Sequence, residues 1–78
     1  MAAIAANAYA EDGIVCVGLQ DGREIRFPAA SNRRLRNAMP EQLNHIEIIC
    51  NGTGLHWPDL DEDLSIAGLM AGVDTQSD

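Results

Sequence analysis

The chain has 78 residues, which is enough for one small domain and leaves no length for a second. Its formal net charge of −7 is unevenly spread, because residues 1–40 hold five Arg and four acids whereas residues 41–78 hold eight acids and neither Arg nor Lys. Since phosphate contacts need cations, this composition disfavours direct nucleic-acid binding by the second half and favours a protein partner with a basic surface.

The first half predicts a small antiparallel sheet. Residues 13–19 are rich in β-branched side chains, residues 23–27 alternate polar and apolar side chains, and Gln20–Gly22 between them is typical of a tight hairpin turn. Glycine accepts the positive φ that such a turn needs. We expect a further strand over residues 3–8 to pair with this hairpin, and Pro28 to end its last strand.

The middle of the chain predicts a short helix and a second hairpin. A helix over residues 31–39 is expected to begin at Ser31 or Asn32 and to stop at Pro40, where the next turn begins. The hairpin is expected to have strands at residues 45–50 and 55–57 and a turn at residues 51–54.

The C-terminal part predicts a tail helix. Ser65 or Asp63 can cap its first amides, Gly72 can close it, and the polar residues 72–78 are expected to fray. Together these elements predict one α+β domain over residues 1–78. It would consist of a small antiparallel sheet of four to five short strands with two or three short helices packed on one side.

The two cysteines do not indicate catalysis or a metal site. Cys16 and Cys50 lie in apolar runs, so we expect two buried thiols rather than a disulfide. A dyad of Cys50 with His56, or of Cys16 with His45, would need an exposed and activated thiolate. The spacing of these residues also fits no zinc finger. We therefore expect no enzyme activity, no cofactor and no metal.

The N-terminal residues and the short apolar runs indicate a cytoplasmic location. The opening residues lack the basic segment of a signal peptide. No apolar run approaches the roughly 20 residues of a membrane span.

The acidic run after Trp57 allows three interpretations: a metal site, a helix N-terminus, or a surface that meets a positive partner. Asp59, Asp61 and Asp63 alternate as in a calcium loop, but Leu64 stands where that loop needs glycine and Met70 where it needs glutamate. A helix dipole accounts for one or two acids near its N-terminus better than for four. The amount of charge therefore favours a partner.

The candidate contact residues combine these acids with the single tryptophan. Trp57 either covers the small core or anchors an interface, since tryptophan is enriched at binding hot spots. The arginines of residues 33–36 are either a solvated helix face or partners of the acids, the latter giving a homodimer with complementary surfaces. The predicted partner-binding residues are Glu47, Trp57, Asp59, Asp61, Glu62 and Asp63.

Three blocks of the sequence resemble the bacterial domain of unknown function 2442 family. They are "DGREIRFP", "RLRNAMPEQ" and "GTGLHWPDLDEDLSIAGL", which are similar to the family patterns DGR-x-I-x-x-P, RL-x-x-A-x-P-E-Q and G-x-G-I-H-W-P-x-L-D-E-D-I-S-V-x-G-L-L. The chain departs from the family at residues 29–32, where aromatic residues are common. The resemblance implies an α+β fold and a small accessory or regulatory module, sometimes part of a toxin–antitoxin-like pair.

Two functions follow as hypotheses. In the first, this acidic protein inhibits a nucleic-acid-binding machine, such as a CRISPR effector subunit, in the manner of a phage anti-CRISPR protein. In the second, it is an accessory or antitoxin-like module that binds a small partner protein. Salt distinguishes them, because charge-driven binding weakens steeply with ionic strength and a packed apolar interface does not. The one-sided charge favours the first.

Overall fold

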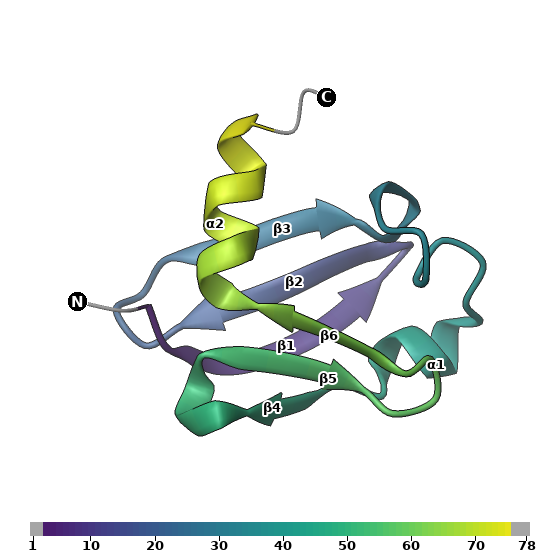
Figure 1. The fold of residues 1–78 in the computed structure, drawn as a ribbon, viewed down its shortest axis with the longest axis horizontal. Helices are drawn as coiled ribbons and strands as arrows, with labels where there is room; N and C mark the ends of the chain where they lie inside the picture. Colours follow the sequence, from purple (N-terminus) through teal and green to yellow (C-terminus); the bar gives the residue numbers. More distant parts are fainter. Residues whose placement is uncertain (1–2, 76–78) are drawn as a thin grey trace.

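The computed structural model describes residues 3–75, which form six strands, two α-helices and two short 3₁₀-helical turns (Figure 1). The strands are β1 (Ala5–Glu11), β2 (Ile14–Leu19), β3 (Glu24–Pro28), β4 (Glu47–Ile49), β5 (Gly54–Trp57) and β6 (Glu62–Ser65). The helices are α1 (Pro40–Asn44) and α2 (Ile66–Thr75), and the 3₁₀ turns are Ala29–Ser31 and Cys50–Gly52.

The first sheet has the order β1-β2-β3 and is antiparallel throughout, as the sequence predicts for this half of the chain. The turn from β2 to β3 contains Gly22 at a φ of 93°, and the backbone N–H of Gly22 donates to the carbonyl of Leu19 at 3.0 Å. Pro28 ends β3, as predicted. The first strand is also confirmed, although it runs to Glu11, beyond the predicted residues 3–8.

The second sheet has the order β4-β5-β6, so the prediction of one sheet with four to five strands is wrong. The β4–β5 hairpin confirms the predicted strands at residues 45–50 and 55–57 with somewhat different bounds. The unexpected element is β6, which contains two acids of the acidic run. These acids therefore do not form a helix N-terminus; they lie in a strand that pairs with β5.

Residues 31–39 do not form the predicted α-helix. The side-chain Oδ1 of Asn32 accepts hydrogen bonds from the backbone N–H groups of Arg34 and Leu35, at 2.8 Å and 3.1 Å. Such local bonds offer the backbone an alternative to helical bonding. The proline at position 40 also disfavours a helical conformation at Met39, so α1 begins only at Pro40.

The tail helix is confirmed, and Ser65 caps it. The Ser65 Oγ accepts a hydrogen bond from the backbone N–H of Gly68 at 2.9 Å. The predicted stop at Gly72 is wrong, because α2 continues to Thr75, and part of the predicted frayed tail is therefore helical. Residues 76–78 of that tail lie outside the described residues.

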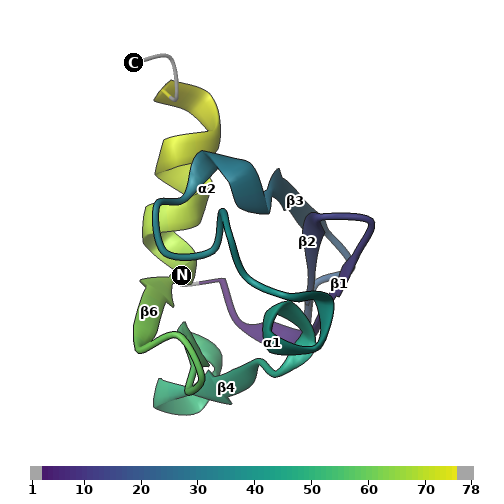
Figure 2. The same ribbon diagram turned by 90° about the vertical axis from the view of Figure 1, so that its right-hand side faces the viewer.

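The helices do not share one side of the molecule, contrary to the prediction. Helix α1 packs on β1, whereas α2 contacts β6 and β3 and projects beyond the sheets (Figures 1 and 2). Over residues 3–75, no helix combines the length and apolarity needed to cross a bilayer.

The core lies between the two sheets. Val15 and Val17 from β2 belong to the same buried cluster as Leu55 and Trp57 from β5, and all four are fully buried. The Trp57 indole Nε1–H donates to the backbone carbonyl of Leu43 at 3.0 Å, so its polar group is satisfied inside the protein. The core therefore joins the second sheet to α1 as well as to the first sheet.

Candidate functional site: an acidic face on the second sheet

One row of side chains runs across all three strands of the second sheet. The register places Glu47 of β4 opposite His56 of β5, and His56 opposite Asp63 of β6. Neighbours in such a row lie on the same face of the sheet. The alternate residues of β5, Leu55 and Trp57, are buried in the core, so the row faces outward.

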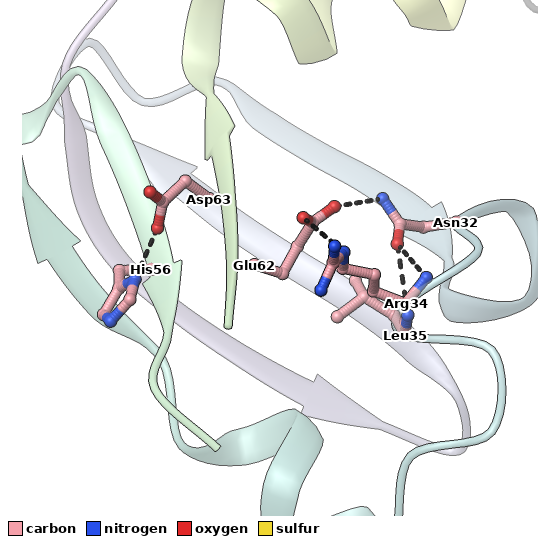
Figure 3. Close-up of polar contacts among 6 residues, drawn as sticks. All are labelled: Asn32, Arg34, Leu35, His56, Glu62 and Asp63. Atoms are coloured by element: carbon pink, nitrogen blue, oxygen red, sulfur yellow. Dashed lines mark hydrogen bonds and ion pairs between the residues drawn. The ribbon is translucent and has the colours of Figure 1, made fainter. Parts of the chain in front are cut away.

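His56 is bonded within this row. Its Nδ1 lies in a short contact with a carboxylate oxygen of Asp63, and the two side chains point toward one another (Figure 3). The hydrogen bond to Asp63 raises the pKa of His56 above its ordinary value. Partial burial is the next largest effect and lowers this pKa, while the charges of Asp63, Glu47 and Asp61 each raise it by less.

Asp61 completes the cluster from the turn that precedes β6. It is exposed and has a left-handed backbone conformation with a φ of 53°. Glu47 and Asp63 are exposed as well. We call the set of Glu47, His56, Asp61 and Asp63 the acidic face.

Asp59 lies in the same turn and has a partner of its own. Its Oδ2 is 2.8 Å from the Nδ1 of His45, which precedes β4, and both side chains are about half exposed. This pair is a second His–carboxylate contact, but it lies outside the cross-strand row. Asp59 thus remains accessible at the end of the second sheet.

Glu62, predicted as a contact residue, is used inside the protein. Its carboxylate accepts a hydrogen bond from the Asn32 Nδ2 at 3.0 Å and lies 3.7 Å from the Nε of Arg34 (Figure 3). Only 18% of its side chain is exposed. These contacts attach residues 32–35 to β6, and they show that one arginine of the 33–36 run pairs with an acid of the same chain.

Trp57 is also placed away from the surface. It has no exposed area, so it belongs to the core, which is the first of its two predicted roles. Of the six predicted contact residues, four are exposed: Glu47, Asp59, Asp61 and Asp63.

The thiols differ in their exposure. Cys16 is buried, but Cys50 is exposed, so the prediction of two buried thiols is wrong for Cys50. Cys50 has a φ of 55° in the turn after β4, where the strand ends and the alternation of the apolar run no longer applies. Both are free thiols.

Metal ligands do not gather in the part of the chain that the structure describes. No group of three or more His, Cys, Asp or Glu side chains among residues 3–75 has an arrangement that could hold a metal ion. The histidines instead bond single carboxylates through Nδ1. The acidic face therefore consists of exposed carboxylates around one imidazole, that of His56.

A shallow groove lies at a different place, between the β1–β2 turn, the turn at residues 29–31 and α1. Its volume is about 580 Å³, and its lining is mostly apolar but includes the polar residues Glu11, Asp12, Arg36 and Asn44. The lining includes Ala10, Ile14, Ala30, Arg36 and Leu43. The sequence contains no signal for this groove, because its walls come from segments far apart in the chain.

Comparison with known proteins identifies relatives without assigning an activity. The model of a family described as "Protein of unknown function (DUF2442)" matches residues 5–75. A crystal structure of a protein of unknown function from Rhodospirillum rubrum is 40% identical, with a TM-score of 0.86, and the match covers 92% of this chain and 89% of that one.

A second similar structure is the solution NMR structure of an uncharacterized protein from Chromobacterium violaceum. It is 31% identical with a TM-score of 0.78, and the match covers 88% of this chain and 65% of that chain. No curated protein matches the chain.

Proposed function

The chain belongs to the DUF2442 family, and from the acidic face of its second sheet we propose that it is a non-enzymatic protein-binding module that engages a partner with a basic surface. The observation that carries this proposal is the outward row of Glu47, His56 and Asp63 with Asp61 beside it. We propose a nucleic-acid-binding machine, such as a CRISPR effector subunit, as the class of partner, and inhibition as the result of binding.

The distribution of the arginines supports this proposal. Arg23 pairs with Asp21, Arg26 with Glu24 and Arg34 with Glu62, all with acids outside the acidic face. None of these three arginines therefore pairs with a carboxylate of the acidic face, where the neighbouring basic group is the imidazole of His56. A surface of this kind attracts cations, and long-range attraction raises the rate of encounter with a basic partner.

The partner class follows from the chemistry of nucleic-acid binding. A channel that binds a phosphate backbone is lined with Lys and Arg. An acidic protein surface presents carboxylates to the same cations, and binding there would exclude the nucleic acid. This mode of action requires no catalytic group on the chain.

The test is the capture of a partner from a host lysate by three tagged proteins. They are the wild type, the triple variant E47Q/D61N/D63N, and a control triple variant D21N/E24Q/E41Q. The three control acids are exposed and lie outside both the acidic face and the groove described above. Both triple variants raise the net charge by the same amount.

We expect the wild type and the control variant to retain a nucleic-acid-binding protein at about 0.05 M salt and to lose it at about 0.5 M, where charges are screened within a few ångströms. The variant of the acidic face should retain little at either concentration. The purified partner should then lose its nucleic acid when the wild type is added. Equal retention by the two triple variants would disprove the acidic face as the contact surface.

The groove beside α1 favours a second function, that of an accessory or antitoxin-like module that binds a small partner protein. The apolar residues of its lining suit a packed interface. So does the exposed side chain of Met39, which lies between the lining residues Ala38 and Pro40 in the sequence. On this proposal a small protein stays bound at about 0.5 M salt. An Ala30→Glu variant, which places a charge in the groove, should release it, while E47Q/D61N/D63N should not.

A further inference from the structure

We propose that protonation of His56 regulates the acidic face, with the imidazolium acting as an internal cation that competes with the cation of the partner. Binding of a basic partner then strengthens as the pH rises and His56 loses its proton. This inference rests on the proposed function, because it concerns the regulation of the same surface.

The geometry places His56 between two carboxylates. Glu47 and Asp63 are its direct cross-strand partners on β4 and β6, and the Cβ atoms of such partners lie about 4.5–5.5 Å apart. The charged groups that face His56 are thus Glu47 from β4, Asp63 from β6 and Asp61 from the turn before β6. All three are acids, and each favours the charged form of the imidazole.

The charge of the acidic face depends on this one proton. With a neutral imidazole the face carries the three negative charges of Glu47, Asp61 and Asp63, and with the imidazolium its net negative charge decreases from three units to two. The raised pKa of His56 moves this change toward neutral pH. Because the two equilibria are linked, a bound cation must lower the pKa of His56. The free energy of this shift equals the free energy by which protonation of His56 weakens binding of the cation.

The other histidine supplies a matched control. His45 bonds one carboxylate, that of Asp59, in the turn, and it does not belong to the cross-strand row. Its side chain is about half exposed, whereas 30% of the His56 side chain is exposed. Removing His45 takes away the other imidazole, which lies just before β4, but leaves the row of Glu47, His56 and Asp63 complete.

The experiment uses a fluorescent oligoarginine peptide as the basic probe. Its affinity for the wild type, His56→Gln and His45→Gln is measured by fluorescence anisotropy from about pH 5 to about pH 8, where unperturbed and shifted histidines titrate. In parallel, the imidazole resonances of the free wild type and of Glu47→Gln are titrated by NMR, which reports the proton of His56 without any ligand.

We expect wild-type affinity to rise about fourfold with pH, the effect of one charge about 5 Å away under water-like screening. His56→Gln should lose most of this rise and His45→Gln should keep most of it. The NMR pKa of His56 should fall in Glu47→Gln. Binding of the peptide with the same affinity across the range would overturn the regulation and leave the proposed function standing.

Two other results are also decisive. A His56 pKa that Glu47→Gln does not change would overturn the internal-cation role even if the peptide binds. No binding of the peptide at any pH would overturn the proposed function together with its regulation.

Discussion

Replacing Trp57 with phenylalanine tests whether this residue belongs to the core or to an interface. Trp57 is fully buried, and its indole N–H bonds the carbonyl of Leu43. The substitution leaves that buried carbonyl without its donor, which costs about 1–3 kcal/mol. It also removes part of the bicyclic ring, and the lost burial and the void add about 1 kcal/mol or more.

The expected loss is thus about 2–4 kcal/mol, a large share of the roughly 4–12 kcal/mol that about 80 residues provide. Urea unfolding followed by far-ultraviolet circular dichroism measures it, since the variant lacks the tryptophan signal. The control is Met39→Leu, a change of similar volume in a side chain that is 58% exposed, with an expected effect within about 0.5 kcal/mol. Similar losses in the two variants would refute the core assignment of Trp57.

Three further predictions concern a turn, a thiol and a proton. Gly52→Ala should destabilise the protein by about 1–2 kcal/mol more than Gly22→Ala. Both glycines have a positive φ, +91° and +93°, but only at Gly52 would an added Cβ meet a side chain, that of Ile4. Equal losses in urea unfolding would contradict this. A thiol reagent should modify Cys50 rapidly and Cys16 only after unfolding, and rapid reaction of both would show that the first sheet opens. The stability that His56 adds should be complete below about pH 6.5 and should decline as pH rises through its raised folded-state pKa. The melting-temperature difference between the wild type and His56→Gln should therefore shrink with pH, and a constant difference would contradict it.

The elements that the sequence predicts well are those formed by neighbouring residues. The β2–β3 hairpin and the β4–β5 hairpin depend on β-branched runs and on glycine-containing turns, all of which are visible locally. The capping of α2 by Ser65 is equally local. Such features do not depend on the rest of the fold.

The errors arise where distant contacts decide the structure. Residues 62–65 contain two acids, which are depleted in strands, yet they form β6 because Leu64 pairs with Leu55 and Glu62 meets Asn32 and Arg34. The failure of the helix at residues 31–39 has a local cause that could be read from the sequence: asparagine readily bonds its own following backbone.

The sequence predicts Glu47, Asp61 and Asp63 as contact residues, and the structure shows only that all three are exposed and lie close to His56. The sequence does not predict this arrangement around the histidine. The position of His56 between two of these acids depends on the register of β6, which the sequence did not predict. Without β6 the histidine has one acidic neighbour instead of a row, and its role as an internal cation cannot be inferred.

The most direct test of the acidic face as a contact surface is a map of the contact on the protein itself. Amide NMR spectra of the wild type, titrated with the captured basic partner, would show which residues change on binding. We predict that the changes concentrate on β4, β5, β6 and the β5–β6 turn, around Glu47, His56, Asp61 and Asp63. Changes centred on the groove beside α1, with these four residues unaffected, would contradict the acidic face as the binding surface.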